Sequence, residues 1–277
     1  MDSRFRLGLV IIVILLVGVI AGTAMAGNGF SEDKVVGHSK GNHRLDCYIV
    51  RPWESDAPED VSFPVIVWAN GWGGNNVAGE TTTQDWYAEM LQQWAVDGPY
   101  IVVAANAWSA REDDVLQCLQ WMIDQNAEEG GEYEGSVNTS KIGLAGHSQG
   151  AGAVVKAGDG EPNGFDITTV LAMNPYGPSW VSAGDQDGPM MVLTGKYDST
   201  TPYSWTYPVF EAQLETGNDA VYAVHQGAGH SNLELYQEVI KLWWQFQLND
   251  ENDAFDAMTD LLATLDWVTE YSGSYDN

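Results

Sequence analysis

Residues 141–155, KIGLAGHSQGAGAVV, decide the fold of this chain. An apolar strand pattern at Ile142–Ala145 leads into Gly-x-Ser-x-Gly at 146–150, and small residues with helical character follow. A serine on such a tight strand-to-helix turn has a strained backbone that exposes its hydroxyl, and the flanking glycines avoid clashes across the turn. The pattern predicts a nucleophile at Ser148, with an ordinary glycine-rich turn as the alternative.

Short apolar runs alternate with amphipathic segments on both sides of this stretch. The runs Val65–Trp68, Tyr100–Ala105, Val170–Met173 and Met190–Leu193 are typical of strands buried on both faces. Helical spacing of apolar residues separates most of them. The sequence therefore predicts one α/β domain at 27–277, with a mostly parallel central sheet flanked by helices on both faces. The segment Pro175–Pro189 is too short for a helical lid, so we expect an open site.

A serine hydroxyl needs a base that takes its proton. His230 lies in the loop Gly227–Ser231, between the last predicted strand and a Trp-rich helix, and we favour it over His225, which ends a strand. Asp198 follows the strand Met191–Thr194 and is the predicted partner of the imidazole. The order Ser, Asp, His is that of the α/β-hydrolase fold, which we therefore predict.

Two backbone N–H groups are expected to bind the oxyanion that such a reaction generates. One belongs to Gln149, the residue after the nucleophile. The other belongs to Trp72 in the glycine-rich loop Asn70–Gly74, with Gly71 as the near alternative. The alternative is that this loop is an ordinary glycine-rich turn with no role in binding.

The net charge of −28, from 39 acidic and 11 basic residues, argues against nucleic acid and anionic membrane surfaces as partners. Such a surface keeps a protein soluble in high salt, so a salt-rich environment is our leading explanation and an acidic secreted protein is the alternative. We expect no metal, no cofactor and a monomer.

The N-terminus predicts export from the cytoplasm. Arg4 and Arg6 precede an apolar run at Leu7–Met25 that ends in Ala-Met-Ala, so residues 1–26 are interpreted as a signal peptide. An uncleaved membrane anchor is the alternative, since the run approaches the length of about 20 residues that spans a bilayer. Cys47 and Cys118 could form a disulfide in an oxidising compartment or remain two buried thiols, and sequence leaves both open.

These pieces together resemble the bacterial cutinase and polyester (PET) hydrolase family. The resemblance covers most of the mature chain, from Pro64–Val67 through the serine motif, Asn174–Tyr176, Thr194–Ser199, Gly229–Asn232 and Trp243–Phe246 to an acidic loop and a terminal segment containing Trp267. It implies that Trp72 and Tyr176 flank the ester and grip an aromatic or acyl unit.

The sequence thus predicts a secreted serine carboxylic-ester hydrolase, with Ser148, Asp198 and His230 as its triad, acting on polyester or bulky esters. A small-ester or carbohydrate acetyl esterase is the alternative within enzymes. A non-catalytic binding module on the same scaffold is the alternative outside them.

Overall fold

The computed structural model describes residues 31–40, 43–53, 61–73, 85–158, 164–177 and 188–272. The predicted signal peptide, residues 1–26, lies outside them, as do residues 178–187 of the segment in which we expected no lid. Within the described residues, no helix combines the length and the apolar character that a membrane span requires.

Strands and helices alternate along most of the described chain, as the apolar runs predicted. The elements in chain order are β1 (Ser31–Lys40), β2 (His43–Arg51), β3 (Phe63–Ala69), α1 (Asp85–Asp97), β4 (Ile101–Asn106), α2 (Glu112–Ala127), β5 (Val137–His147), α3 (Gln149–Ala157), β6 (Thr169–Met173), β7 (Met190–Gly195), α4 (Tyr203–Thr216), β8 (Ala220–His225), the 3₁₀ helix η3 (Leu233–Tyr236), α5 (Gln237–Asn249), α6 (Asn252–Leu262) and β9 (Trp267–Ser272).

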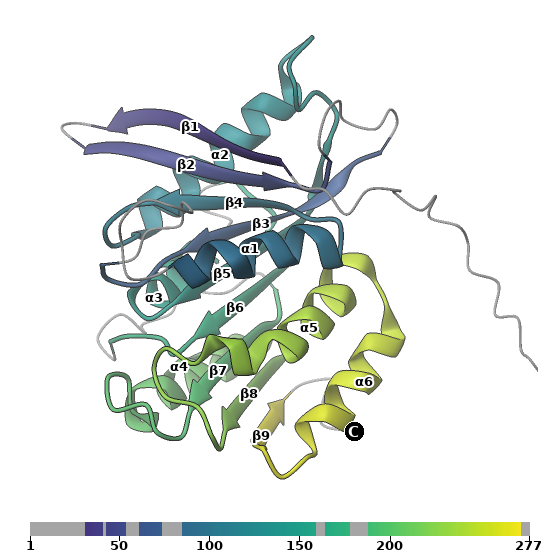
Figure 1. Cartoon of the computed structure of the whole chain (residues 1–277). Coiled ribbons are helices and arrows are strands. Elements are labelled where there is room, and N and C mark those ends of the chain that lie inside the picture. Colours follow the sequence, from purple (N-terminus) through teal and green to yellow (C-terminus); the bar gives the residue numbers. More distant parts are fainter. Residues whose placement is uncertain are drawn as a thin grey trace, which may run out of the picture.

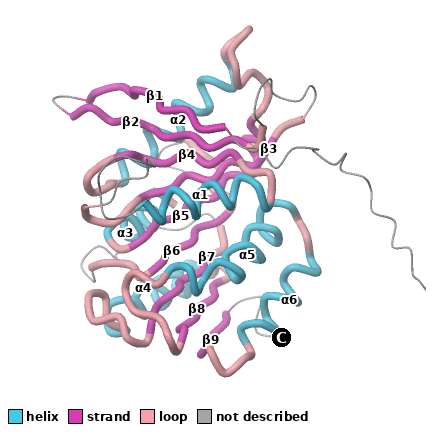
Figure 2. Tube along the Cα trace, in the orientation of Figure 1, coloured by secondary structure: helices cyan, strands magenta, loops and turns pink. Residues whose placement is uncertain are grey.

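The described strands form a single sheet in the order β1-β2-β4-β3-β5-β6-β7-β8-β9 (Figures 1 and 2). The strands from β4 to β8 in that order all pair in parallel. Antiparallel pairs occur only towards the two edges, at β1–β2, β2–β4 and β8–β9. The predicted α/β architecture with a mostly parallel sheet is confirmed.

Helices cover both faces of the sheet, because successive side chains of a strand point to opposite faces. Val65 and Val67 of β3 enter a core that is closed by α2, α3 and α4, whereas Ile66 and Trp68 enter a second core beneath α1, α5 and α6. Figure 1 shows α1, α5 and α6 on the near side of the sheet. With both faces occupied, the edge where the parallel strands end remains free to carry a site.

The C-terminal region differs from the sequence prediction. The expected acidic loop after Phe246 is the helix α6, which buries Ala254, Met258 and Leu262 at helical spacing against the second core. The many acidic residues of that segment hid this apolar stripe, since they face outward. Trp267 then begins β9, which pairs with β8 and covers that edge of the sheet.

The structure decides the question that the sequence left open for the two cysteines. Cys47 in β2 and Cys118 in α2 form a disulfide, with their Cα atoms 5.8 Å apart and the two residues 71 positions apart in sequence. The bridge ties the antiparallel edge of the sheet to the helix that packs over it. Both cysteines are buried in the first core.

Replacing both cysteines, in Cys47→Ala/Cys118→Ala, should lower the melting temperature by about 10 °C. The disulfide lowers the conformational entropy of the unfolded chain, which for a loop of this length stabilises the folded state by about 4 kcal/mol. Differential scanning calorimetry of the two proteins measures the shift. A variant that melts with the wild type would contradict the prediction, and dithiothreitol should affect only the wild type.

Candidate active site

Loops from four parallel strands meet at the carboxyl edge of the sheet. Ser148 directly follows β5, Asp198 lies three residues after β7, His230 lies five residues after β8, and Trp72 lies in the turn after β3. The N–H of Tyr197 donates to the carbonyl of Ala228 at 2.9 Å, which joins the β7 and β8 loops. The structure therefore brings together residues that are far apart in sequence.

Ser148 has a backbone conformation that residues other than glycine rarely adopt, with φ 55° and ψ −118°. Its N–H donates to the carbonyl of Met173 and its carbonyl accepts from the N–H of Tyr176, both at 3.0 Å, and these bonds hold the turn. A Cβ on Gly146 would come within 2.4 Å of the Gly150 carbonyl oxygen, and one on Gly150 within 2.1 Å of the Ala69 carbonyl oxygen. Both motif glycines are therefore required by close backbone approach.

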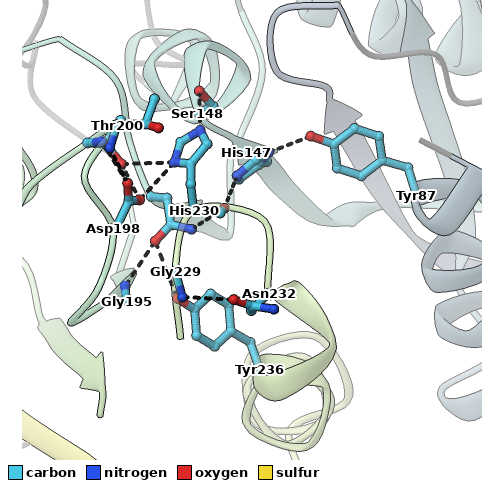
Figure 3. A network of polar contacts seen from close by, with 12 residues as sticks. Tyr87, His147, Ser148, Gly195, Asp198, Thr200, Gly229, His230, Asn232 and Tyr236 are labelled. Carbon is cyan, nitrogen blue, oxygen red and sulfur yellow. Dashed lines mark hydrogen bonds and ion pairs between the residues drawn. The ribbon is translucent and has the colours of Figure 1, made fainter. Parts of the chain in front are cut away.

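A continuous line of hydrogen bonds joins the three predicted residues (Figure 3). Nε2 of His230 lies 3.0 Å from Oγ of Ser148, and Nδ1 lies 2.7 Å from Oδ2 of Asp198. The alternative base, His225, accepts the N–H of Gly227 through Nδ1 at 3.1 Å, and its ring packs edge-on against Trp267. The geometry needed for proton transfer from Ser148 thus belongs to His230.

Asp198 is buried and is held by two threonines that the sequence analysis missed. The N–H groups of Thr200 and Thr201 both donate to Oδ1 at 2.8 Å, and the Thr201 hydroxyl donates to Oδ2 at 2.6 Å. Burial raises the pKa of Asp198, but the hydrogen bonds from His230 and Thr201 outweigh it and hold the pKa below its ordinary value. An aspartate with hydroxyl residues two and three positions later is a recognisable Asx-turn signal.

His147, which we expected to pack rather than act as a base, is buried beside the predicted base. Its Nε2–H donates to the backbone carbonyl of His230 at 2.8 Å, and its Nδ1 has a short hydrogen bond with the hydroxyl of Tyr87. Burial, which disfavours the imidazolium, lowers the pKa of His147 from 6.5 to about 3. A neutral imidazole can donate from one nitrogen and accept at the other, as both contacts require.

Tyr87 connects this histidine to the predicted oxyanion loop. Its phenolic oxygen has a hydrogen bond with the backbone of Gly71, which lowers the pKa of the phenol against the larger, raising effect of burial. The ring of Tyr87 packs on Trp68 of β3, with centroids 5.2 Å apart. Because the backbone of Gly71 is already hydrogen-bonded to Tyr87, Trp72 is the better candidate of the two for donating an N–H to the oxyanion.

Asn174 provides a second donor to the carbonyl of His230. Its Nδ2 donates at 2.8 Å, while its Oδ1 accepts from the N–H of Gly195 at 3.1 Å and from the hydroxyl of Tyr236 at 3.3 Å. The residue has φ 46°, a left-handed conformation that asparagine tolerates better than most residues. The backbone of His230 is therefore held from two sides, by His147 and Asn174.

A pocket of about 330 Å³ opens onto Ser148. Trp72 and Tyr176, predicted to flank a substrate, both line it, as does Gln149. Gln149 is the first residue of α3, and the first N–H groups of a helix have no partner within it. Trp72 is 67% exposed, and Tyr176 packs edge-on against Trp205.

Within the described residues, no group of three or more histidine, cysteine, aspartate or glutamate side chains is arranged to hold a metal ion. Comparison of the chain with known protein families and with curated proteins finds no match. The assignment of a function therefore depends on the geometry of the site.

The free energy of unfolding should decrease as the pH is lowered, because His147 takes up a proton when the chain unfolds. Its pKa is about 3 in the folded protein and 6.5 ordinarily, so between these values the unfolded chain binds the additional proton and acidification favours unfolding. The loss is about 1.4 kcal/mol per pH unit, or about 2 kcal/mol at pH 5. The contribution of Asp198, whose pKa is lowered, is lost only further down, below the ordinary value of 3.8.

Urea unfolding of the wild type and of His147→Gln at pH 6.5, 5.5 and 5.0 separates this contribution from those of other groups. The wild type should lose more stability than the variant across this interval. Equal pH dependence in the two proteins would show that residue 147 takes up no proton on unfolding.

Proposed function

We propose that this protein is a serine carboxylic-ester hydrolase with the α/β-hydrolase fold. The observation that carries the proposal is the unbroken hydrogen-bond line from the Asp198 carboxylate through His230 to the Ser148 hydroxyl. The parallel sheet, the strained turn at Ser148 and the chain order Ser, Asp, His support it.

In the first half of the reaction, Nε2 of His230 takes the proton of Ser148 while Oγ bonds to the ester carbonyl carbon. The N–H groups of Trp72 and Gln149 bind the resulting oxyanion, aided by the N-terminus of α3. The C–O bond to the alcohol then breaks, and the imidazolium gives its proton to the departing alkoxide. Asp198 stabilises the imidazolium throughout this half.

In the second half, the same steps run with water. Neutral His230 takes a proton from water, whose oxygen attacks the acyl carbon of the acyl-enzyme. Collapse of the second tetrahedral intermediate returns the proton to Oγ of Ser148 and releases the carboxylic acid. No cofactor is needed, because both protons pass through His230.

His147 and Asn174 act as positioning residues in this scheme. Both donate a hydrogen bond to the backbone carbonyl of His230. A fixed backbone at this residue keeps its imidazole between Ser148 and Asp198. The carbonyl of His230 sets the tautomer of His147, because it can only accept from Nε2–H, and the Tyr87 hydroxyl then donates to Nδ1 and orients the ring. A proton-transfer distance near 3 Å depends on such support.

The substrates that we propose are bulky or polymeric esters, of which the polyesters of the resembled family are one class. The pocket at Ser148 is open to solvent and bordered by an exposed indole, Trp72. Aromatic walls of this kind bind flat apolar groups.

We also propose that the protein acts outside the cytoplasm. The apolar run Leu7–Met25 has the form of an export signal. The disulfide between Cys47 and Cys118 is consistent with this location, because such bonds persist in oxidising compartments.

Ser148→Ala should abolish hydrolysis of p-nitrophenyl acetate and covalent labelling by a fluorophosphonate probe. The nucleophilic oxygen is then missing, although pocket and fold remain. His225→Gln is the matched control, since it removes a histidine outside the hydrogen-bond line and should retain both activities. A wild-type protein that the probe fails to label would instead be a binding module.

Tyr87→Phe should lower kcat about tenfold with KM within about twofold, because one buried hydrogen bond that orders the base is lost. Phenylalanine keeps the ring, so a tyrosine that only packs would leave kcat unchanged. Tyr222→Phe is the control for stability, because it removes a buried hydroxyl that bonds Thr206 at 2.8 Å away from the site. Equal kcat in wild type and Tyr87→Phe would refute the positioning role.

A further inference from the structure

A second and larger cavity borders the pocket at Ser148. Its volume is about 730 Å³, and it shares Trp72 and Gln149 with the smaller pocket. The Ser109 side chain reaches the side-chain oxygen of Gln149 through a short hydrogen bond, which fixes the border between the two. A substrate bound at Ser148 and longer than the small pocket can therefore continue directly into this groove.

Small buried residues, two exposed indoles and four charged side chains line the groove. Ala110, Gly152 and Ala153 are the small buried residues, and the last two belong to α3. Trp72 and Trp108 stand nearly perpendicular to each other, with ring centroids 5.9 Å apart. The charged side chains that line the groove are Arg111, Glu112, Asp113 and Lys156.

The two indoles are exposed in a way that packing does not explain. Trp72 is 67% and Trp108 64% exposed, although most tryptophans of the described chain are buried. The backbones beside them are joined, because the N–H of Gly73 donates to the carbonyl of Trp108 at 2.7 Å. Two exposed indoles in edge-to-face contact form an apolar surface beside Ser148, the proposed nucleophile.

The four charged side chains of the groove suit some ligands better than others. Arg111 and Lys156 can donate hydrogen bonds, whereas Glu112 and Asp113 only accept them. The two cations and two carboxylates sum to no net charge, so they offer an anion no net attraction, and an aromatic ester has carbonyl acceptors but no donors for the carboxylates. A sugar can pair with all four charged side chains, because its hydroxyl groups both donate and accept hydrogen bonds. The C–H face of a pyranose also packs on an indole.

We propose that this groove, lined by Trp72, Trp108, Arg111, Glu112 and Lys156, is a subsite for the saccharide chain of an acylated polysaccharide. The inference rests on the proposed esterase function and narrows its substrate class. The acyl group of the substrate is attacked at Ser148, while neighbouring sugar units lie across the indoles of the groove. Esters of carbohydrate chains are then preferred over aromatic polyesters.

Binding can be measured without hydrolysis by titrating the full-length Ser148→Ala protein with unacylated xylohexaose, cellohexaose and mannohexaose in a calorimeter. At least one of them should bind, and adding Trp108→Ala should weaken that binding at least tenfold. Tyr203→Ala, which removes an exposed aromatic side chain on α4 outside the groove, is the control and should bind as tightly as the parent.

The kinetic test compares acetylated xylohexaose with p-nitrophenyl acetate in the active protein. Trp108→Ala should lower the ratio of the two kcat/KM values at least tenfold. If p-nitrophenyl acetate is not hydrolysed at all, the proposed function fails, whereas active protein that binds none of the three oligosaccharides overturns only the saccharide subsite. Binding of terephthalate that is lost in Arg111→Gln/Lys156→Gln would also overturn it, in favour of an anionic aromatic ligand.

Discussion

The left-handed backbone of Ser148 is the constraint on which the rest of the site depends. Only three non-glycine residues in the described chain have positive φ, and two of them, Ser148 and Asn174, follow the adjacent strands β5 and β6. Such conformations cost free energy and persist where the surroundings hold them. Here, hydrogen bonds to Met173 and Tyr176 hold Ser148, and the N–H of Asn174 donates to the carbonyl of Leu193 at 2.7 Å. Two of the three strained non-glycine positions therefore lie in the turns that carry Ser148, the proposed nucleophile, and Asn174, which holds the backbone of the proposed base.

A neutral buried histidine, His147, connects the proposed base to Tyr87 and so to the predicted oxyanion loop. Nε2–H of His147 donates to the His230 carbonyl, and Nδ1 has a hydrogen bond with the Tyr87 hydroxyl. Burial removes the charged form, so one tautomer serves both contacts. Gly71, Tyr87, His147 and His230 are thus linked by one chain of hydrogen bonds. Satisfied buried networks of this kind rigidify a site.

The sequence predicted the strands of the parallel sheet because each is a short, continuous apolar run, as Val65–Trp68 illustrates. It missed α6 because acidic residues obscure the stripe of Ala254, Met258 and Leu262. The roles of Tyr87 and Thr201 were missed for different reasons. Tyr87 resembles any buried aromatic residue of a helix, whereas the Asx pattern after Asp198 was readable but not used.

By itself, the sequence determined the order of strands and helices from β2 to α5 and pointed to Ser148, Asp198 and His230, because periodicity and motifs are properties of neighbouring residues. Only the tertiary structure decided that these side chains meet, since their hydrogen bonds join residues 82 and 32 positions apart. The same holds for the bridge from Cys47 to Cys118 and for the groove between Trp72 and Trp108. Such distances depend on which strands lie side by side in the sheet, and packing over the whole domain sets that order.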